Sequence, residues 1–198
     1  IYKDKDTQRK LRNGISAENP KKRILVVCDK FLAESGAISY ILDALDSSNT
    51  VDIFDQAIPD PTIEVVGKGL SVICKVRPEI VIGFGGGSAI DTAKGMIYFA
   101  GVRNLVPKPK FITIPTTSGT GSEVTSAAVI TDSESKSKHL ISSDDILADV
   151  AILDPRLTLS VPPSITANYR DGCADTCPGG LCCKRKQCIL GRAVRKSN

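Results

Sequence analysis

Two segments of the sequence have residue types and spacing suited to phosphate binding, and the first is rich in glycine. Gly85-Gly86-Gly87-Ser88 follows the apolar run 80–84 and precedes residues 89–94, which have helix-forming character. A strand, a glycine turn and a helix start let backbone N–H groups approach a phosphate, and the helix dipole favours its negative charge. The spacing differs from the Gly-x-Gly-x-x-Gly fingerprint. A plain tight turn is therefore the alternative for three glycines taken alone.

The second segment is rich in hydroxyl groups. Residues 115–125 read Pro-Thr-Thr-Ser-Gly-Thr-Gly-Ser-Glu-Val-Thr and follow the apolar run 111–114. Two such loops at the carboxyl ends of strands can face one crevice, where open α/β sheets bind their ligands. We expect the hydroxyl groups to serve phosphate and ribose.

Asp29 is a third candidate, because it directly follows the apolar run 24–28. An acidic residue at the end of a first strand can accept hydrogen bonds from an adenosine ribose and repel a 2′-phosphate. The alternative is an ordinary aspartate at a strand end, which is the reading favoured when the residue is taken alone.

The elements that would position these residues alternate along the chain. Short apolar, β-branched runs typical of buried parallel strands occur at 24–28, 51–54, 80–84 and 111–114. Apolar residues at helical spacing predict one helix over 31–45. They predict a second helix from a cap at Thr62 to a stop at Arg77-Pro78. Repeated strand, helix and strand indicate an α/β fold with a doubly wound parallel sheet.

Several motifs together resemble the iron-containing (group III) alcohol dehydrogenase family. They occupy residues 85–94, 114–125, 129–132, 150–155 and 159–163, in the order and spacing of that family, so the resemblance covers roughly residues 20–167. It implies a Rossmann-like dinucleotide-binding domain followed by a C-terminal helical domain. It also implies hydride transfer between NAD(P) and an alcohol or aldehyde, with iron or another divalent metal acting as a Lewis acid on the substrate oxygen.

The resemblance also implies roles for individual residues. Asp29 would contact the adenosine ribose and favour NAD over NADP, and Lys138 would reach a ribose. The other cofactor-binding positions follow from the two loop motifs: Gly86, Gly87, Ser88 and Asp91 at the diphosphate, and Thr116, Thr117, Thr120 and Thr125 along the cofactor. The substrate would be a small alcohol or aldehyde, and members of the family are often homo-oligomers.

The composition changes near residue 167. Residues 1–167 hold 19 Lys and Arg against 20 Asp and Glu, whereas residues 168–198 hold 7 against 2. Five of the seven cysteines also lie in this last segment: Cys173, Cys177, Cys182, Cys183 and Cys188. We therefore divide the chain into a dinucleotide-binding α/β domain, 1–167, and a tail, 168–198, that is dissimilar to the family and that we expect to be disordered.

The tail lacks the family's metal-binding motif. Family members continue with Thr-Gly-Met-Asp-x-Leu-Thr-His-Ala-x-Glu-Ala-Tyr, whereas residues 168–181 read Asn-Tyr-Arg-Asp-Gly-Cys-Ala-Asp-Thr-Cys-Pro-Gly-Gly-Leu. Back-translation of the tail with allowed codons, followed by removal of one base after Asn168, restores the complete family motif. We therefore predict a one-base insertion after Asn168. The chain would then be an inactive fragment of an NAD-dependent alcohol dehydrogenase that holds none of the Asp and His metal ligands.

A different class of function is a non-catalytic nucleotide-binding module whose cysteine-rich tail binds zinc or a partner. The tail cysteines lack paired Cys-x-x-Cys spacing, and the single histidine, His139, lies far upstream. The basic cluster 184–186 has no aromatic residues for stacking on bases, which argues against nucleic acid. No apolar run approaches the roughly 20 residues of a membrane span, and residues 1–12 are charged, so we expect a cytoplasmic location.

Overall fold

The computed structural model describes residues 21–159 of the 198-residue chain. Five parallel strands form one sheet in the order β2-β1-β3-β4-β7. Their bounds are β1 Arg23–Asp29, β2 Thr50–Ala57, β3 Ile80–Gly85, β4 Lys110–Pro115 and β7 Val150–Ala151. The four strands predicted from apolar runs are all present, and the parallel α/β fold is confirmed.

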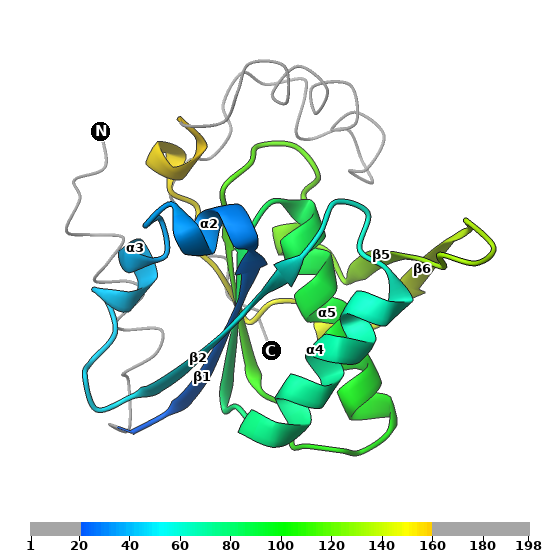
Figure 1. The fold of residues 1–198 in the computed structure, drawn as a ribbon, viewed down its shortest axis with the longest axis horizontal. Helices are drawn as coiled ribbons and strands as arrows, with labels where there is room; N and C mark the ends of the chain where they lie inside the picture. The colour runs from blue at the N-terminus through cyan, green and yellow to red at the C-terminus, as the bar shows by residue number, and fades with distance from the viewer. Residues whose placement is uncertain (1–20, 160–198) are drawn as a thin grey trace.

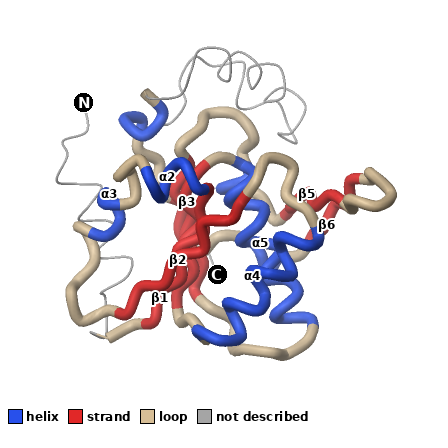
Figure 2. Tube along the Cα trace, in the orientation of Figure 1, coloured by secondary structure: helices blue, strands red, loops and turns tan. Residues whose placement is uncertain are grey.

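Helices cover both faces of this sheet, as Figure 1 and Figure 2 show. The short helices α2 (Lys30–Glu34) and α3 (Ser39–Leu42) lie on one face, and α4 (Ile63–Val76) and α5 (Gly87–Val102) lie on the other. A two-stranded antiparallel hairpin, β5 (Ala127–Thr131) and β6 (Lys138–Ser142), projects beyond α5. Three 3-10 turns complete the described part: η1 (Ser122–Val124), η2 (Asp144–Ile146) and η3 (Pro155–Thr158).

The prediction of one helix over residues 31–45 is wrong. The segment forms α2 and α3 instead, with Gly36 between them at a φ of +80°. That left-handed conformation interrupts the helical hydrogen-bond ladder and is open to glycine because glycine has no Cβ. The apolar periodicity was still informative, since Leu32, Ile38 and Ile41 are all buried against the sheet.

Helix α4 follows its predicted bounds because local chemistry sets both of its ends. The Thr62 hydroxyl accepts a hydrogen bond from the Val65 N–H at 3.4 Å, which caps the first turn. Arg77 ends the helix in a left-handed conformation, and Pro78 cannot continue it.

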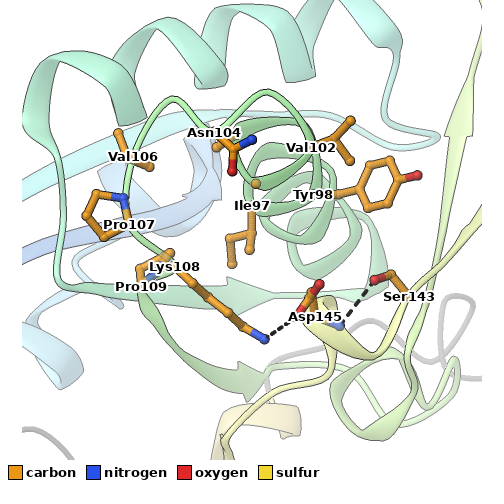
Figure 3. Close-up of a pocket in the computed structure, with 12 residues that line it drawn as sticks. Ile97, Tyr98, Val102, Asn104, Val106, Pro107, Lys108, Pro109, Ser143 and Asp145 are labelled. Carbon is orange, nitrogen blue, oxygen red and sulfur yellow. Dashed lines mark hydrogen bonds and ion pairs between the residues drawn. The ribbon is translucent and has the colours of Figure 1, made fainter.

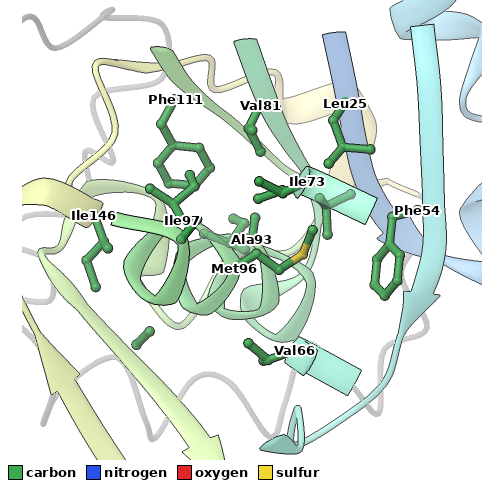
Figure 4. Close-up of a cluster of buried hydrophobic side chains, with 14 of the residues drawn as sticks. Leu25, Phe54, Val66, Ile73, Val81, Ala93, Met96, Ile97, Phe111 and Ile146 are labelled. Carbon is green, nitrogen blue, oxygen red and sulfur yellow. The ribbon is translucent and has the colours of Figure 1, made fainter. Parts of the chain in front are cut away.

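Alternation of side chains along the strands creates two apolar cores. Leu25, Val81 and Phe111 point toward α4 and α5, where they meet Ile73 and Met96 (Figure 4). Their sequence neighbours, such as Val26 and Ile82, point to the opposite face, toward α2 and α3. Burial on both faces explains why these strands are continuous apolar runs.

The strand order reverses direction between β1 and β3. From β1 the chain moves to β2 on one side, and it then returns past β1 to β3 on the other side. In open α/β sheets, ligands bind in a crevice at the carboxyl ends of the strands beside such a topological switch point. In this chain the crevice is the end of the sheet formed by the loops that follow β1, β3 and β4. Asp29 and the glycine turn follow the two strands that flank this point. No helix in the described range 21–159 is long and apolar enough to cross a membrane.

The buried thiol of Cys28, in strand β1, gives a pH-dependent contribution to stability. Burial, with smaller contributions from Asp29 and Asp55, raises the pKa of Cys28 from its ordinary value of 9.0 to about 12. The native state therefore binds the thiol proton more tightly than the unfolded state does. The resulting stabilisation of the native state is complete below pH 9 and is lost as the pH rises from 9 toward 12.

We expect the free energy of unfolding to fall above pH 9 more steeply for the wild type than for Cys28→Ala. The difference in slope should approach about 1.4 kcal/mol per pH unit. Urea unfolding of both proteins between pH 8 and pH 11 measures this difference. If the free energies of unfolding of the two proteins changed in parallel with pH, the raised pKa of Cys28 would be contradicted.

Candidate functional site: a dinucleotide crevice at the ends of β1, β3 and β4

Two glycines of the turn formed by residues 85–88, Gly85 and Gly87, have no room for a side chain. Gly85 ends β3 at a φ of +141°, and a Cβ placed there would lie 2.9 Å from the Ala89 Cβ. Gly86 then caps α5 without any side-chain hydrogen bond. The first N–H groups of a helix have no intrahelical acceptor, so the turn presents backbone donors to the crevice.

The threonine loop, residues 115–125, lies directly against this turn. The Thr116 N–H donates to the Gly85 carbonyl at 2.9 Å. A Cβ on Gly86 would lie 3.4 Å from the Thr117 side chain, and a Cβ on Gly87 would lie only 2.6 Å from the Thr120 hydroxyl. The structure therefore brings together the two loops that were expected to face one crevice.

Asp29 lies beside the same turn. Its Oδ2 is 3.6 Å from the position that a Gly85 Cβ would occupy. Its Oδ1 accepts a hydrogen bond from the Leu32 N–H at 2.9 Å and so caps α2. The carboxylate thus has a structural contact through one oxygen, while the other oxygen lies near the glycine turn.

Two of the predicted cofactor residues contact other parts of the protein instead of pointing only into the crevice. Both oxygens of Asp91 accept hydrogen bonds, from the Ser122 hydroxyl at 2.5 Å and the Val129 N–H at 3.2 Å. The Thr125 hydroxyl lies 3.2 Å from the Lys94 Nζ. Asp91 and Thr125 therefore help to connect α5 to the threonine loop.

Ser88 and Lys138 have different surroundings. Ser88 is half-buried in the first turn of α5, and its carbonyl accepts a hydrogen bond from the Thr92 hydroxyl. Lys138 is on the projecting hairpin, and its Nζ is 2.6 Å from the Asp60 carboxylate. Contact of Lys138 with a ribose remains a prediction, because the ionic partner observed for it is Asp60.

The sequence analysis missed Lys94, whose side chain is fully buried beneath the threonine loop. Its Nζ donates to the carbonyls of Ser122, Thr125 and Ala127 at 2.6 to 2.8 Å. A lysine inside an apolar stretch, three residues after an aspartate on the same helix, was the available signal.

A pocket of about 400 Å³ lies at the other end of α5 and is separate from the crevice. Figure 3 shows Tyr98, Val102 and Pro107 on its walls, with Lys108 paired to Asp145 at 2.7 Å. The glycine turn is at the N-terminal end of α5, whereas this pocket is lined by residues near the C-terminal end.

Comparison with known proteins decides the family. The family model described as iron-containing alcohol dehydrogenase matches residues 1–155. The chain belongs to the iron-containing alcohol dehydrogenase family. The described fold agrees with that of family members whose structures have been solved. A sulfoacetaldehyde reductase from Bifidobacterium kashiwanohense, solved in complex with NAD+, has a TM-score of 0.71 and 33% identity, and the match covers 81% of this chain and 46% of the reductase.

Relatives in this family include alcohol dehydrogenases that are named for different alcohols. A 1-propanol dehydrogenase of Citrobacter freundii is 48% identical over 147 residues, which are 74% of this chain and 40% of the relative. A long-chain-alcohol dehydrogenase of Geobacillus thermodenitrificans is 39% identical, again over 74% of this chain and 40% of the relative. The chain thus spans about two fifths of the length of these relatives.

The metal of this family requires ligands that residues 21–159 do not group together. Within that range, no three His, Cys, Asp or Glu side chains are arranged so that they could hold a metal ion. The cysteine-rich tail, with its predicted change of reading frame, lies outside the described residues, as does the domain boundary at residue 167.

Proposed function

We propose that this chain contains the NAD-binding domain of an alcohol dehydrogenase acting on small primary alcohols or aldehydes. The observation that carries the proposal is the contact between the glycine turn and the threonine loop at the switch point of the sheet. Bound NAD would supply the hydride acceptor. The chain's own residues would bind the diphosphate through the first turn of α5 and orient the riboses through the hydroxyls of the threonine loop.

We propose that residues 168–198 do not supply the catalytic half of the reaction. The family's metal ligands are expected after residue 167, where residues 168–181 do not match the family motif. The chain would then bind NAD without oxidising alcohol. The small-alcohol assignment rests on the resemblance and on relatives such as the 1-propanol dehydrogenase.

Titration of the full chain with NADH tests the binding proposal. We expect a saturable change in nicotinamide fluorescence that ADP reverses by competition. Absence of binding by both NADH and ADP up to millimolar concentration would refute the proposed function.

The choice between NAD and NADP is predicted to depend on the charge of Asp29. Asp29→Asn removes the charge and keeps a side-chain oxygen that can cap α2. Because the carboxylate would repel a 2′-phosphate, the preference for NADH over NADPH should narrow about tenfold in this variant. Asp29→Gly should also narrow the preference, with some added loss of stability from the missing cap.

The measurement is the ratio of the NADPH and NADH dissociation constants. Asp52→Asn, an exposed position in the middle of β2, removes the same charge from a neighbouring strand and is the matched control. An unchanged ratio in both Asp29 variants would show that another residue selects the cofactor.

A further inference from the structure

Helix α5 holds segment 122–129, which runs from η1 into the start of β5, through two side chains on one of its faces. Lys94 is 0% exposed, and its ammonium donates to the Ser122 carbonyl at 2.6 Å, the Thr125 carbonyl at 2.8 Å and the Ala127 carbonyl at 2.7 Å. Asp91, one turn earlier, accepts hydrogen bonds from the Ser122 hydroxyl and the Val129 N–H. The two residues therefore pair with backbone and hydroxyl groups of the stretch that connects η1 to β5.

This arrangement is costly compared with an apolar side chain at the same place. Burial lowers the pKa of Lys94 to about 8, although Asp91 and Glu123 oppose that shift. Burial also raises the pKa of Asp91 against its hydrogen bonds. Buried ionic groups are expensive relative to well-packed apolar ones, and one attested use of them is to specify a single geometry.

The segment held in this way, 122–129, includes the last residues of the threonine loop. Ser122 is two residues from Thr120, whose hydroxyl accepts from the Ser122 N–H at 3.3 Å. Thr120 in turn occupies the space that a Gly87 side chain would need. The position of segment 122–129 therefore determines how the threonine loop meets the glycine turn.

The order of strands gives the crevice a direction. Asp29 follows β1, the glycine turn follows β3 and the threonine loop follows β4, and these strands are successive neighbours in the sheet. If Asp29 meets the adenosine ribose and the glycine turn meets the diphosphate, the threonine loop is beside the nicotinamide half.

We propose that Lys94 and Asp91 are positioning residues, which hold segment 122–129 so that the threonine loop can receive the nicotinamide half of the dinucleotide. The assignment of the nicotinamide half rests on the proposed function. The holding of the segment by α5 does not, so the two can be tested separately.

Amide hydrogen exchange on the full chain without nucleotide tests the holding step. In Lys94→Met, exchange of residues 116–129 should accelerate at least about tenfold, while strands β1 and β2 keep their protection. Lys68→Met, at an exposed position on α4, makes the same chemical change and should leave both regions unchanged. Unchanged protection of 116–129, or an equal acceleration everywhere, would overturn the proposal.

Nucleotide binding tests the positioning step. We expect Lys94→Met to weaken NADH binding about tenfold and ADP binding less than about twofold, because ADP lacks the nicotinamide half. Equal weakening of both ligands, or of neither, would overturn the positioning role. Failure of the wild type to bind either ligand would instead refute the proposed function and leave the exchange result to decide the holding step.

Ser122→Ala keeps the test decisive if Lys94→Met does not fold. It removes only the hydroxyl that donates to Asp91 and leaves the Ser122 carbonyl available to Lys94. We expect amide exchange to accelerate about threefold in residues 116–129 alone, and NADH binding, but not ADP binding, to weaken about threefold. Wild-type exchange and wild-type NADH affinity in this variant would contradict a role for the Asp91 contact.

Discussion

Deleting one base directly after the codon for Asn168, and expressing the complete downstream frame, should produce metal-dependent oxidation of small primary alcohols with NAD. The 198-residue chain itself should show none. In the shifted frame the tail is predicted to encode the family's Asp- and His-bearing motif, which residues 168–181 lack. A metal acting as a Lewis acid contributes several kcal/mol to stabilising the developing alkoxide, so the expected gain in rate is at least about a thousandfold.

The measurement is NADH formation from 1-propanol with added ferrous iron, before and after treatment with a chelator. A matched control carries the same deletion and an alanine codon in place of the restored histidine. It should bind NADH normally and turn over far more slowly. Turnover by the unrepaired chain at an ordinary dehydrogenase rate would refute the fragment interpretation. An immediate stop codon in the new frame would refute the predicted insertion.

Gly87→Ala should weaken NADH binding by roughly 10- to 100-fold. The added Cβ would lie 2.6 Å from the Thr120 hydroxyl and 2.7 Å from its methyl group, so the threonine loop must move away from the glycine turn. Forcing extra volume into a well-packed contact costs about 1 to 3 kcal/mol, which sets the expected loss. Titration by nicotinamide fluorescence measures it.

Gly67→Ala is the matched control for this substitution. Gly67 lies on the exposed side of α4, and a Cβ added there would have no neighbour within 4 Å. Alanine should leave NADH affinity unchanged and stabilise the helix by about 0.5 to 1 kcal/mol. If Gly87→Ala bound NADH as tightly as Gly67→Ala, close approach of the two loops would not be needed for binding.

The loops of the candidate cofactor site all lie in this chain, although it spans fewer than half the residues of its known relatives. Asp29, the glycine turn and the threonine loop all follow strands of a single sheet that lies within residues 21–159. Each loop is attached to a strand that is buried on both faces, so the scaffold that positions the crevice belongs to this chain.

The sequence by itself determined four strands of the parallel sheet, the caps of α4, the glycine turn and the threonine loop, because each depends on neighbours in the chain. Apolar runs define buried parallel strands, the Thr62 hydroxyl reaches the next helical turn, and the glycine turn follows directly from β3. The sequence motifs were also sufficient for the family, since four of the five occur in order within residues 1–155, which the family model matches.

Only the tertiary structure decided what the charged residues near the crevice contact. Lys94 meets the Ala127 carbonyl 33 residues away, and Lys138 meets Asp60 across 78 residues. Asp91, expected at a diphosphate, uses both oxygens to hold a segment more than 30 residues further along the chain. Spacing along the sequence cannot encode these pairings, because packing of the hairpin region against α5 and against the loop before α4 brings the partners within hydrogen-bond distance.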